Sequence, residues 1–146
     1  MASDADCIFC KIVGGKISCY RVYEDDHILS FLDVGPLTHG HTLVIPKAHY
    51  VTLDTMPTEL TQACMAAVSQ VGRAVMAAVN AGEQSQAGGW NVLQNNGEVA
   101  GQVVQHVHFH IIPRVAGDGL GYRWPAGKLE QADAKHLVVA ITKSLI

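Results

Sequence analysis

The sequence predicts one α+β domain with a largely antiparallel sheet, one long helix and a C-terminal helix. Short runs rich in β-branched and aromatic residues alternate with Gly, Pro, Asn and Asp, as in strands joined by turns. A stretch at 57–82 places apolar residues at helical spacing. Strands before and after one long helix are typical of α+β domains. The 146 residues, of which 49% are hydrophobic and 16% charged, can enclose one core.

The first half of the chain is expected to form a helical turn and three strands. The segment CIFCKIVGG at 7–15 predicts a short helical turn or loop that ends at its two glycines. The runs at 20–25 and 27–33 predict two strands joined by an acidic turn. A loop broken by glycine and proline leads to a buried strand at 41–46.

The second half is expected to form the long helix, two more strands and a final helix. Pro57 suits the first turn of the long helix, and Gly82 suits its end. The segments at 90–95 and 105–113 predict strands, and 131–146 predicts the final helix. The helices are expected to cover one face of the sheet.

Composition and organisation limit the class of protein. No internal repeat or linker divides residues 1–146, so we expect one domain, with a flexible N-terminus at 1–6 and a C-terminal extension at 126–146. The net charge of −3, without a basic stripe, argues against a nucleic-acid partner. No secretory signal or bilayer-length apolar run is visible, so we expect no membrane partner. We expect the protein in the cytoplasm, and consider the nucleus, with its four cysteines reduced.

The segment QHVHFHIIP carries the most informative pattern of the chain. His106, His108 and His110 alternate with apolar residues, which is typical of a half-buried strand. The three imidazoles should therefore share one face, with neighbours roughly 6–7 Å apart. A plain polar surface strand would not need three histidines.

Three chemistries could use such a row of imidazoles: metal binding, acid–base catalysis and nucleophilic attack. The preceding loop, QNNGEVAGQ, helps to choose, because its glycines and amides can surround an anion. By itself an Asn-Gly pair is a common hairpin turn. Beside the histidines, the loop favours phosphoryl transfer; its candidate residues are Asn95, Asn96, Gly97, Gly101 and Gln102.

The chain resembles the histidine triad (HIT) family of nucleotide-binding proteins. HVHFHII matches the family's His-φ-His-φ-His-φ-φ signature, where φ is apolar. FLDVGPLTHGHTLVIPKAH resembles the family's first-half block, and QNNGEVAGQVVQHVHFH resembles its second-half block. The likeness extends from about Cys7 to Pro125 and is greatest to the Hint-like branch of nucleoside phosphoramidases. It implies a HIT-like fold and a homodimer with one continuous sheet. It also implies hydrolysis of adenosine or other purine nucleoside 5′-phosphoramidates, with release of AMP.

The resemblance also implies roles for individual residues. His108 corresponds to the nucleophile that carries a nucleotidyl group, and His110 and His41 correspond to its supporting histidines. Related transferases have Gln where His110 stands, which favours hydrolysis here. Positions that match the nucleotide-binding residues are Asp33 for the ribose, Asn95, Gly101 and Gln102 for the phosphate, and Phe9, Ile12, Ile17 and Val34 around the base.

Two departures from the Hint-like pattern concern the leaving group. Val103 stands where that branch usually has Ser, so a hydroxyl that could orient the leaving nitrogen is missing. Trp124 resembles the Trp of a C-terminal segment that reaches the partner's site, but it lies farther from the triad than in that branch. These departures leave the efficiency and the substrate open.

The pair Cys7 and Cys10 has the spacing of half a zinc site. Alternatives are a redox pair, which lacks the preceding strand, or two small buried residues. The family resemblance implies that His49 and His106 complete a structural zinc site. The remaining histidines and cysteines are expected to be surface or structural residues: His27, His39, His136, Cys19 and Cys64.

Other functions remain open at the level of sequence. One is a dinucleoside polyphosphate hydrolase of the same family. A second is a zinc-binding scaffold with a vestigial nucleotide site, and a third is a cupin-like metal enzyme that uses His106 and His108.

Overall fold

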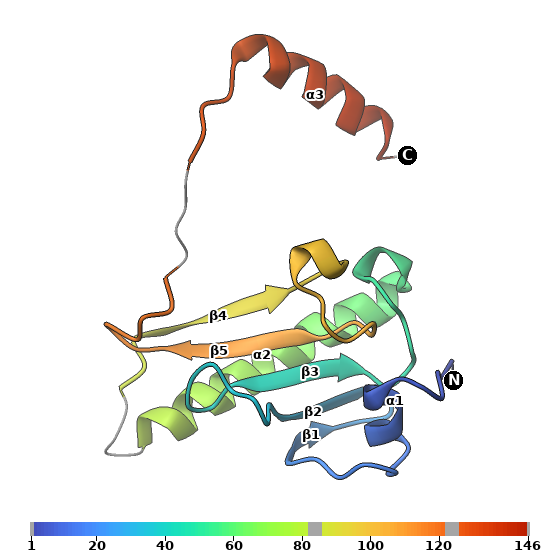
Figure 1. The fold of residues 1–146 in the computed structure, drawn as a ribbon, viewed down its shortest axis with the longest axis vertical. Helices are drawn as coiled ribbons and strands as arrows, with labels where there is room; N and C mark the ends of the chain where they lie inside the picture. Colours follow the sequence, from blue (N-terminus) through green and yellow to red (C-terminus); the bar gives the residue numbers. More distant parts are fainter. Residues whose placement is uncertain (1, 82–85, 122–125, 146) are drawn as a thin grey trace.

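Five antiparallel strands form a single sheet in the order β1-β2-β3-β5-β4 (Figure 1). The computed structural model describes residues 2–81, 86–121 and 126–145. The sheet confirms the predicted α+β class with a largely antiparallel sheet. The strands are β1 (Arg21–Glu24), β2 (Ile28–Leu32), β3 (Thr42–Pro46), β4 (Gly89–Gln94) and β5 (Phe109–Arg114).

The acidic turn between β1 and β2 is fixed by the Asp25 side chain. Its Oδ1 accepts hydrogen bonds from the backbone N–H groups of His27, at 2.8 Å, and Ile28, at 2.7 Å. Asp side chains commonly stabilise turns in this way. The turn starts β2 in register with β3, where Ile28 lies opposite Pro46 and Leu32 opposite Thr42.

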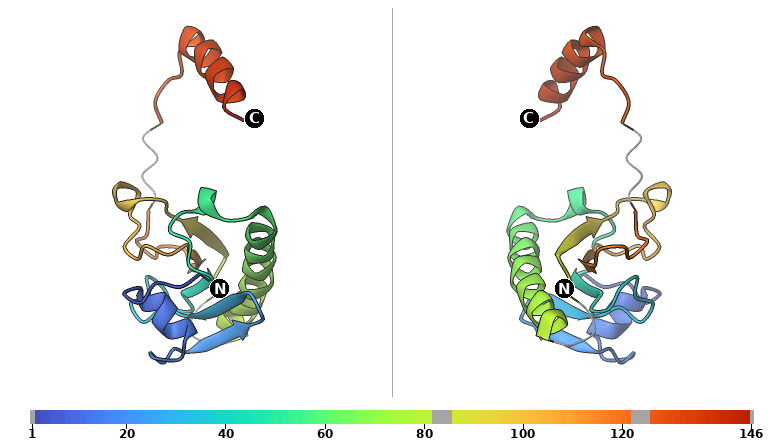
Figure 2. Two further views of the ribbon diagram at one scale, coloured as in Figure 1. Left: turned by 90° about the vertical axis from the view of Figure 1, so that its right-hand side faces the viewer. Right: turned by 90° about the vertical axis from the view of Figure 1, so that its left-hand side faces the viewer.

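The long helix α2 (Thr58–Ala81) covers one face of the sheet (Figure 2). It begins one residue after Pro57, as predicted, whereas Gly82 lies outside the described residues. Its buried stripe packs on Val107, Phe109 and Ile111. The helix also crosses Trp90 closely: a Cβ on Gly72 would lie 2.4 Å from Trp90 Cη2. Gly72 is therefore needed for this packing.

The prediction that helices cover only one face is wrong for the N-terminal helix. The six-residue helix α1 (Ile8–Val13) packs on the opposite face, where Phe9 and Cys10 meet a second apolar cluster (Figure 2). The second layer is needed because β2 and β3 place apolar residues on both faces of the sheet. A sheet with two apolar faces must be covered twice. The residues of the sheet in this second cluster are Leu29, Phe31, Leu43 and Ile45.

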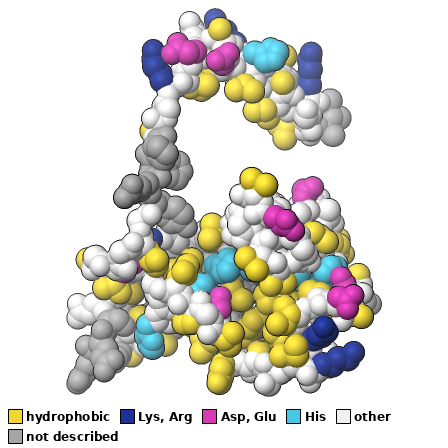
Figure 3. All heavy atoms as spheres, viewed as in Figure 1, with side chains coloured by type: hydrophobic (Ala, Val, Ile, Leu, Met, Phe, Trp, Pro, Cys, Tyr) yellow, Lys and Arg dark blue, Asp and Glu magenta, His cyan; other side chains and the backbone are white. Residues whose placement is uncertain are grey.

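The predicted final helix is present as α3 (Gln131–Lys143), which Figure 1 shows apart from the sheet. None of its residues is buried. Figure 3 shows hydrophobic side chains along one side of this segment. Two 3₁₀ turns, Leu53–Thr55 and Glu98–Ala100, complete the elements of the described residues. Among these residues no helix combines the length and apolarity that crossing a membrane requires.

Candidate active site

The side chains of the histidine-bearing segment alternate between the two faces as predicted, but the strand begins later than the predicted residue 105. Strand β5 begins only at Phe109, so His106 and His108 precede it. The apolar partners are buried against α2, with Val107 and Ile111 at 0% exposure. The three imidazoles lie on the other side of the sheet, which confirms the alternation. The rings of His108 and His110 are 4.9 Å apart between centroids.

The hydrogen bonds of His108 define which of its ring nitrogens can react. Its Nδ1 lies 2.7 Å from the backbone carbonyl oxygen of His106, which can only accept, so Nδ1 carries the proton. Nε2 of the neutral ring then has a free lone pair. Burial lowers the pKa of His108, which keeps the ring neutral near pH 7. The residue is thus poised as a base or a nucleophile.

A similar argument orients the pair His41 and His110. The backbone N–H of Leu37 donates to His41 Nδ1 at 3.0 Å, so His41 carries its proton on Nε2. That Nε2–H donates to His110 Nδ1 at 2.9 Å. His110 must then hold its own proton on Nε2. Burial lowers the pKa of His110 to about 4, so this ring too is neutral and offers one N–H donor.

Asp33, at the end of β2, lies beside this pair. Its Oδ2 is 3.7 Å from His41 Nε2, and its Oδ1 accepts from the Gly35 N–H at 2.8 Å. Burial lowers the pKa of His41, and the Asp33 charge opposes that shift. Asp33, His41 and His110 lie close enough to share a metal ion. However, the proton on His41 Nε2 occupies the nitrogen that would have to bind the metal.

A cavity of about 420 Å³ opens in front of these histidines, and we call it the main cavity. Six of the eight predicted nucleotide-binding residues line it: Phe9, Ile12, Ile17, Asp33, Val34 and Gly101. His108 and His110 are also in its wall. Among the residues that the structure describes, its lining includes no Lys or Arg. A cavity with apolar walls and a few polar groups suits a flat base with a small polar tail.

Several lining residues were not predicted. Helical spacing in α1 could have indicated Ile8, and the alternation of β2 and β3 could have indicated Phe31 and Leu43. Cys19, which was predicted to be structural, lies half-buried in the cavity wall. The other unpredicted lining residues are Ser18, Leu32, Val103 and Val104.

The predicted phosphate donors Asn95 and Gln102 are not among the residues that line the cavity. Gln102 is 2% exposed: its Oε1 accepts from the Gly97 N–H and its Nε2 donates to the Val51 carbonyl, both at 2.7 Å. A buried amide must satisfy its polar groups, so Gln102 is used to hold the loop. Asn95 Nδ2 donates to the Gly101 carbonyl at 3.3 Å. Gly101 has φ +89°, a conformation that favours glycine.

The four predicted metal ligands converge in one place, which we call the Cys/His cluster: Cys7, Cys10, His49 and His106. The Sγ atom of Cys7 lies 3.5 Å from His106 Nδ1, and Cys10 Sγ lies 3.4 Å from His49 Nδ1. The two imidazole Nδ1 atoms are 3.3 Å apart. Zn–S and Zn–N bonds of about 2.3 and 2.1 Å in a tetrahedron place ligand atoms roughly 3.4–3.8 Å apart, so the donor set fits zinc.

The protonation of His106 agrees with a ligand role. Its Nε2 lies 2.9 Å from the Pro46 carbonyl oxygen and must donate to it, which leaves the Nδ1 lone pair facing the thiols. Such a second hydrogen bond commonly orients a metal-binding imidazole. Burial raises the pKa of Cys7, and a bound cation would offset this effect by stabilising the thiolate.

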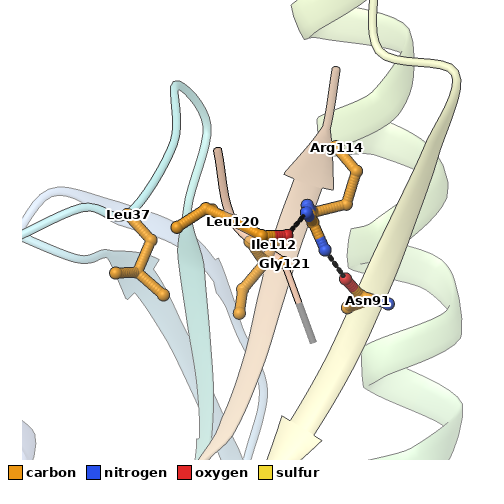
Figure 4. Close-up of a pocket in the computed structure, with 6 residues that line it drawn as sticks. All are labelled: Leu37, Asn91, Ile112, Arg114, Leu120 and Gly121. Atoms are coloured by element: carbon orange, nitrogen blue, oxygen red, sulfur yellow. Dashed lines mark hydrogen bonds between the residues drawn. The ribbon is translucent and has the colours of Figure 1, made fainter. Parts of the chain in front are cut away.

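A second cavity, of about 210 Å³, lies farther along the same face of the sheet (Figure 4). Ile112 and Leu120 contribute apolar lining, and Arg114 lies at its edge. The Arg114 guanidinium donates to Asn91 Oδ1 at 2.6 Å, to both carboxylate oxygens of Asp118 and to the Leu120 carbonyl. This arginine therefore holds the turn that follows β5.

The remaining predictions for single residues have mixed outcomes. His27, His39 and His136 are exposed, as expected for surface histidines. Cys64 is fully buried against the sheet, and burial raises its pKa to about 12, as expected for a structural thiol. Trp124 lies outside the described residues.

Comparison with known proteins places this site in a family. The HIT domain model matches residues 15–117. An adenosine 5′-monophosphoramidase of Candida albicans is 42% identical over 127 residues, which are 86% of this chain and 82% of that protein. The crystal structure of a HIT family protein from Bacillus subtilis aligns with a TM-score of 0.86 and 41% identity, covering 97% of this chain and 98% of the other.

A zinc-bound histidine triad family protein of Mycobacterium smegmatis is also similar. It aligns with a TM-score of 0.67 and 40% identity over 94% of both chains. The family model spans most of the chain, and its match includes the triad, His41 and Asp33. The chain therefore belongs to the HIT family.

Proposed function

We propose that this protein hydrolyses nucleoside 5′-phosphoramidates, with adenosine or another purine nucleoside as the preferred nucleoside and AMP as the product of the adenosine substrates. The observation that carries the proposal is the free Nε2 lone pair of His108 at the wall of an apolar cavity. The similarity to a Candida albicans protein named adenosine 5′-monophosphoramidase supports the substrate class.

The proposed reaction has two steps. His108 Nε2 attacks the α-phosphorus, an N–P bond forms on the enzyme, and the P–N bond to the leaving group breaks. The departing nitrogen takes a proton from solvent and leaves as an amine. Water then attacks the same phosphorus, breaks the His108–phosphorus bond and releases the nucleoside monophosphate together with neutral His108, and one proton returns to solvent.

The neighbouring histidines would stabilise the negative charge that develops on the phosphate during these steps. The Nε2–H of His110 can donate to a phosphate oxygen as charge develops there. The His41 N–H holds His110 in this tautomer. Because these rings are neutral, stabilisation depends on oriented donors. Gly101 also lines the cavity, but its backbone N–H already donates to the Glu98 carbonyl at 2.9 Å.

The shape and charge of the main cavity support a nucleotide with a weakly charged α-phosphate. Phe9 and Ile12 offer flat apolar contacts for a base, and Asp33 can accept hydrogen bonds from ribose hydroxyls. Since the described part of the lining has no Lys or Arg, it offers a highly charged polyphosphate chain no opposite charge. This favours phosphoramidates over the dinucleoside polyphosphates that the alternative function would use.

The Cys/His cluster is proposed to hold one structural zinc ion. Zinc there would tie the start of α1 to the segment before β5 and would leave no open coordination position. This proposal makes a cupin-like mechanism through His106 unnecessary, because His106 faces the cluster and His108 faces the cavity.

A homodimer with one continuous sheet also remains a prediction. Strand β4 is an edge of the five-stranded sheet, so its outer backbone groups can pair with a second copy. Light scattering should give twice the chain mass at micromolar concentration. A monomer at that concentration would contradict the prediction.

The deciding experiment is turnover of adenosine 5′-phosphoramidate and of a dinucleoside polyphosphate side by side. The proposal expects a kcat/KM for the phosphoramidate at least tenfold higher. Equal or reversed rates would favour the polyphosphate hydrolase. Nucleotide binding without turnover of either compound would favour the scaffold.

A further inference from the structure

Helix α1 is a wall shared by the Cys/His cluster and the main cavity. Its thiols, Cys7 just before the helix and Cys10 within it, belong to the cluster. Its apolar residues Ile8, Phe9 and Ile12 line the cavity. One short segment therefore contributes to the predicted metal site and to the predicted nucleotide site.

Phe9 connects the two sites through its ring. The ring centroid lies 5.8 Å from that of His106 in the cluster and 5.3 Å from that of His108 in the cavity, edge-on in both cases. Phe9 is 6% exposed, so it has little freedom to move independently of α1. A shift of α1 would therefore move this ring against the reacting histidine.

A second connection passes through the backbone of His106. Its Nδ1 faces the thiols, while its carbonyl oxygen accepts the Nδ1–H of His108 at 2.7 Å. That hydrogen bond fixes the tautomer in which His108 Nε2 is free. The position of one cluster residue thus determines the tautomer of the nucleophile.

Helix α1 needs external support to keep this position. It has six residues and no side-chain hydrogen bond at its N-cap. Helices this short are not stable alone, because nucleation is costly and few hydrogen bonds follow. Its support includes the apolar contacts of Phe9, Ile12 and Val13 and the cluster itself.

We propose that zinc binding at the Cys/His cluster and nucleotide binding in the main cavity are positively coupled through Phe9 and the His106 backbone. The zinc-bound cluster fixes α1 and so preforms the cavity wall, which lowers the cost of ordering this wall when nucleotide binds. The inference rests on the nucleotide site of the proposed function. It assigns to the metal a positioning role beyond general stability.

Coupling of this kind is reciprocal, and this property gives the test. AMP affinity is measured by calorimetry on zinc-loaded and chelator-stripped protein. Zinc affinity is measured by competition with a chromophoric chelator, with and without saturating AMP. Both comparisons should give the same factor, on the order of tenfold. A change below twofold in either comparison would overturn the proposal.

Two aromatic variants separate coupling from cavity lining. Phe9→Leu should keep zinc but reduce the coupling factor towards one. Phe31→Leu is the matched control. The Phe31 side chain lines the same cavity, and its aromatic contact is with the ring of Phe9. This variant should weaken AMP binding and retain the coupling factor. Loss of coupling in both variants, or in neither, would contradict the proposed route through Phe9.

A measurement on the loaded protein covers the case in which the stripped protein unfolds. With Co²⁺ in the cluster, addition of AMP should shift the visible absorption of wild type and of Phe31→Leu, but not of Phe9→Leu. An unchanged wild-type spectrum at saturating AMP would overturn the coupling. Failure of AMP to bind the loaded protein at all would instead refute the nucleotide site of the proposed function.

Discussion

The Nε2–H of His41 donates to Nδ1 of His110 over 2.9 Å, and the Leu37 N–H fixes the direction of this bond. The two neutral histidines therefore form a chain of hydrogen bonds with one direction, and the remaining N–H of this chain is on His110 Nε2. This direction makes His110 a donor to a phosphate, whereas the bond of His108 Nδ1 to the His106 carbonyl leaves His108 Nε2 free to attack it.

Removing the nucleophile should abolish turnover without abolishing binding. His108→Ala removes the attacking Nε2 and should lower kcat by several orders of magnitude. AMP should still bind, because Asp33 and the apolar lining are unchanged. Rapid quench with labelled substrate should trap a nucleotidyl group on His108 of the wild type. Near-normal turnover of the variant, or label on another residue, would contradict the mechanism.

Loss of the His110 donor should leave measurable activity. His110→Ala is expected to lower kcat by about 10²–10³-fold, the usual effect of removing one oriented donor from a developing charge. His41→Ala should have a smaller effect, because it removes the hydrogen bond that fixes the tautomer of His110 but leaves the His110 ring in place. Steady-state kinetics of both variants test this order. An inactive His41→Ala beside an active His110→Ala would contradict it.

The lowered pKa of His110 predicts a loss of stability in acid. Burial lowers this pKa to about 4, from an ordinary value of about 6.5 in the unfolded chain. The unfolded state therefore binds more protons between these values, so the free energy of unfolding should fall as pH drops from about 6.5 to 4. Urea titrations at several pH values should show a smaller decline for His110→Ala than for wild type. Parallel declines would refute the assignment.

Removal of one thiol should remove metal and stability together. Cys10→Ser is expected to lose most of about one zinc per chain and to unfold at a lower temperature, because metal binding contributes to folding. Cys64→Ala removes a buried thiol outside the cluster and should retain zinc. Elemental analysis and thermal unfolding test both variants. Metal-free wild type, purified without chelator, would exclude the zinc site.

Gln102 should affect stability through the loop that it holds. Gln102→Ala leaves the Gly97 N–H and the Val51 carbonyl without their partner and should cost about 1–3 kcal/mol in the free energy of unfolding. Denaturant unfolding measures the cost. Gln105→Ala, on the same loop, is the control, because its amide makes only one long hydrogen bond of 3.5 Å. Equal stability of Gln102→Ala and wild type would disprove the structural role.

The parts of the fold that follow from local pattern could be predicted from sequence. The alternation of Val107, Phe109 and Ile111 with histidines indicated their faces, and the apolar stripe of α2 indicated a covering helix. The second face was missed because a six-residue helix has too few turns to show its buried side. In the sequence, β2 and β3 appear only as runs of apolar residues, and such runs do not show which element covers each face.

The candidate site shows a similar division. The spacing of Cys7 and Cys10 indicated half of the Cys/His cluster, whereas His49 and His106, which lie far apart in sequence, followed only from family resemblance. The resemblance also gave six of the residues that line the main cavity. The use of Gln102 could not be predicted, because its partner Val51 is 51 residues away and the amide looks identical whether it faces a ligand or a loop. The wall position of Cys19 had no local signal either.

Among the residues that the structure describes, the lining of the main cavity includes Asp33 but no Lys or Arg, and this has a consequence for the end of the catalytic cycle. The substrate's α-phosphate carries one negative charge, whereas AMP near pH 7 approaches two, since the second pKa of a phosphate ester is about 6. Asp33 adds another negative charge, which no described Lys or Arg of the lining offsets. Hydrolysis therefore converts a well-tolerated ligand into a repelled one, so product inhibition should be weak and should decrease further as pH rises.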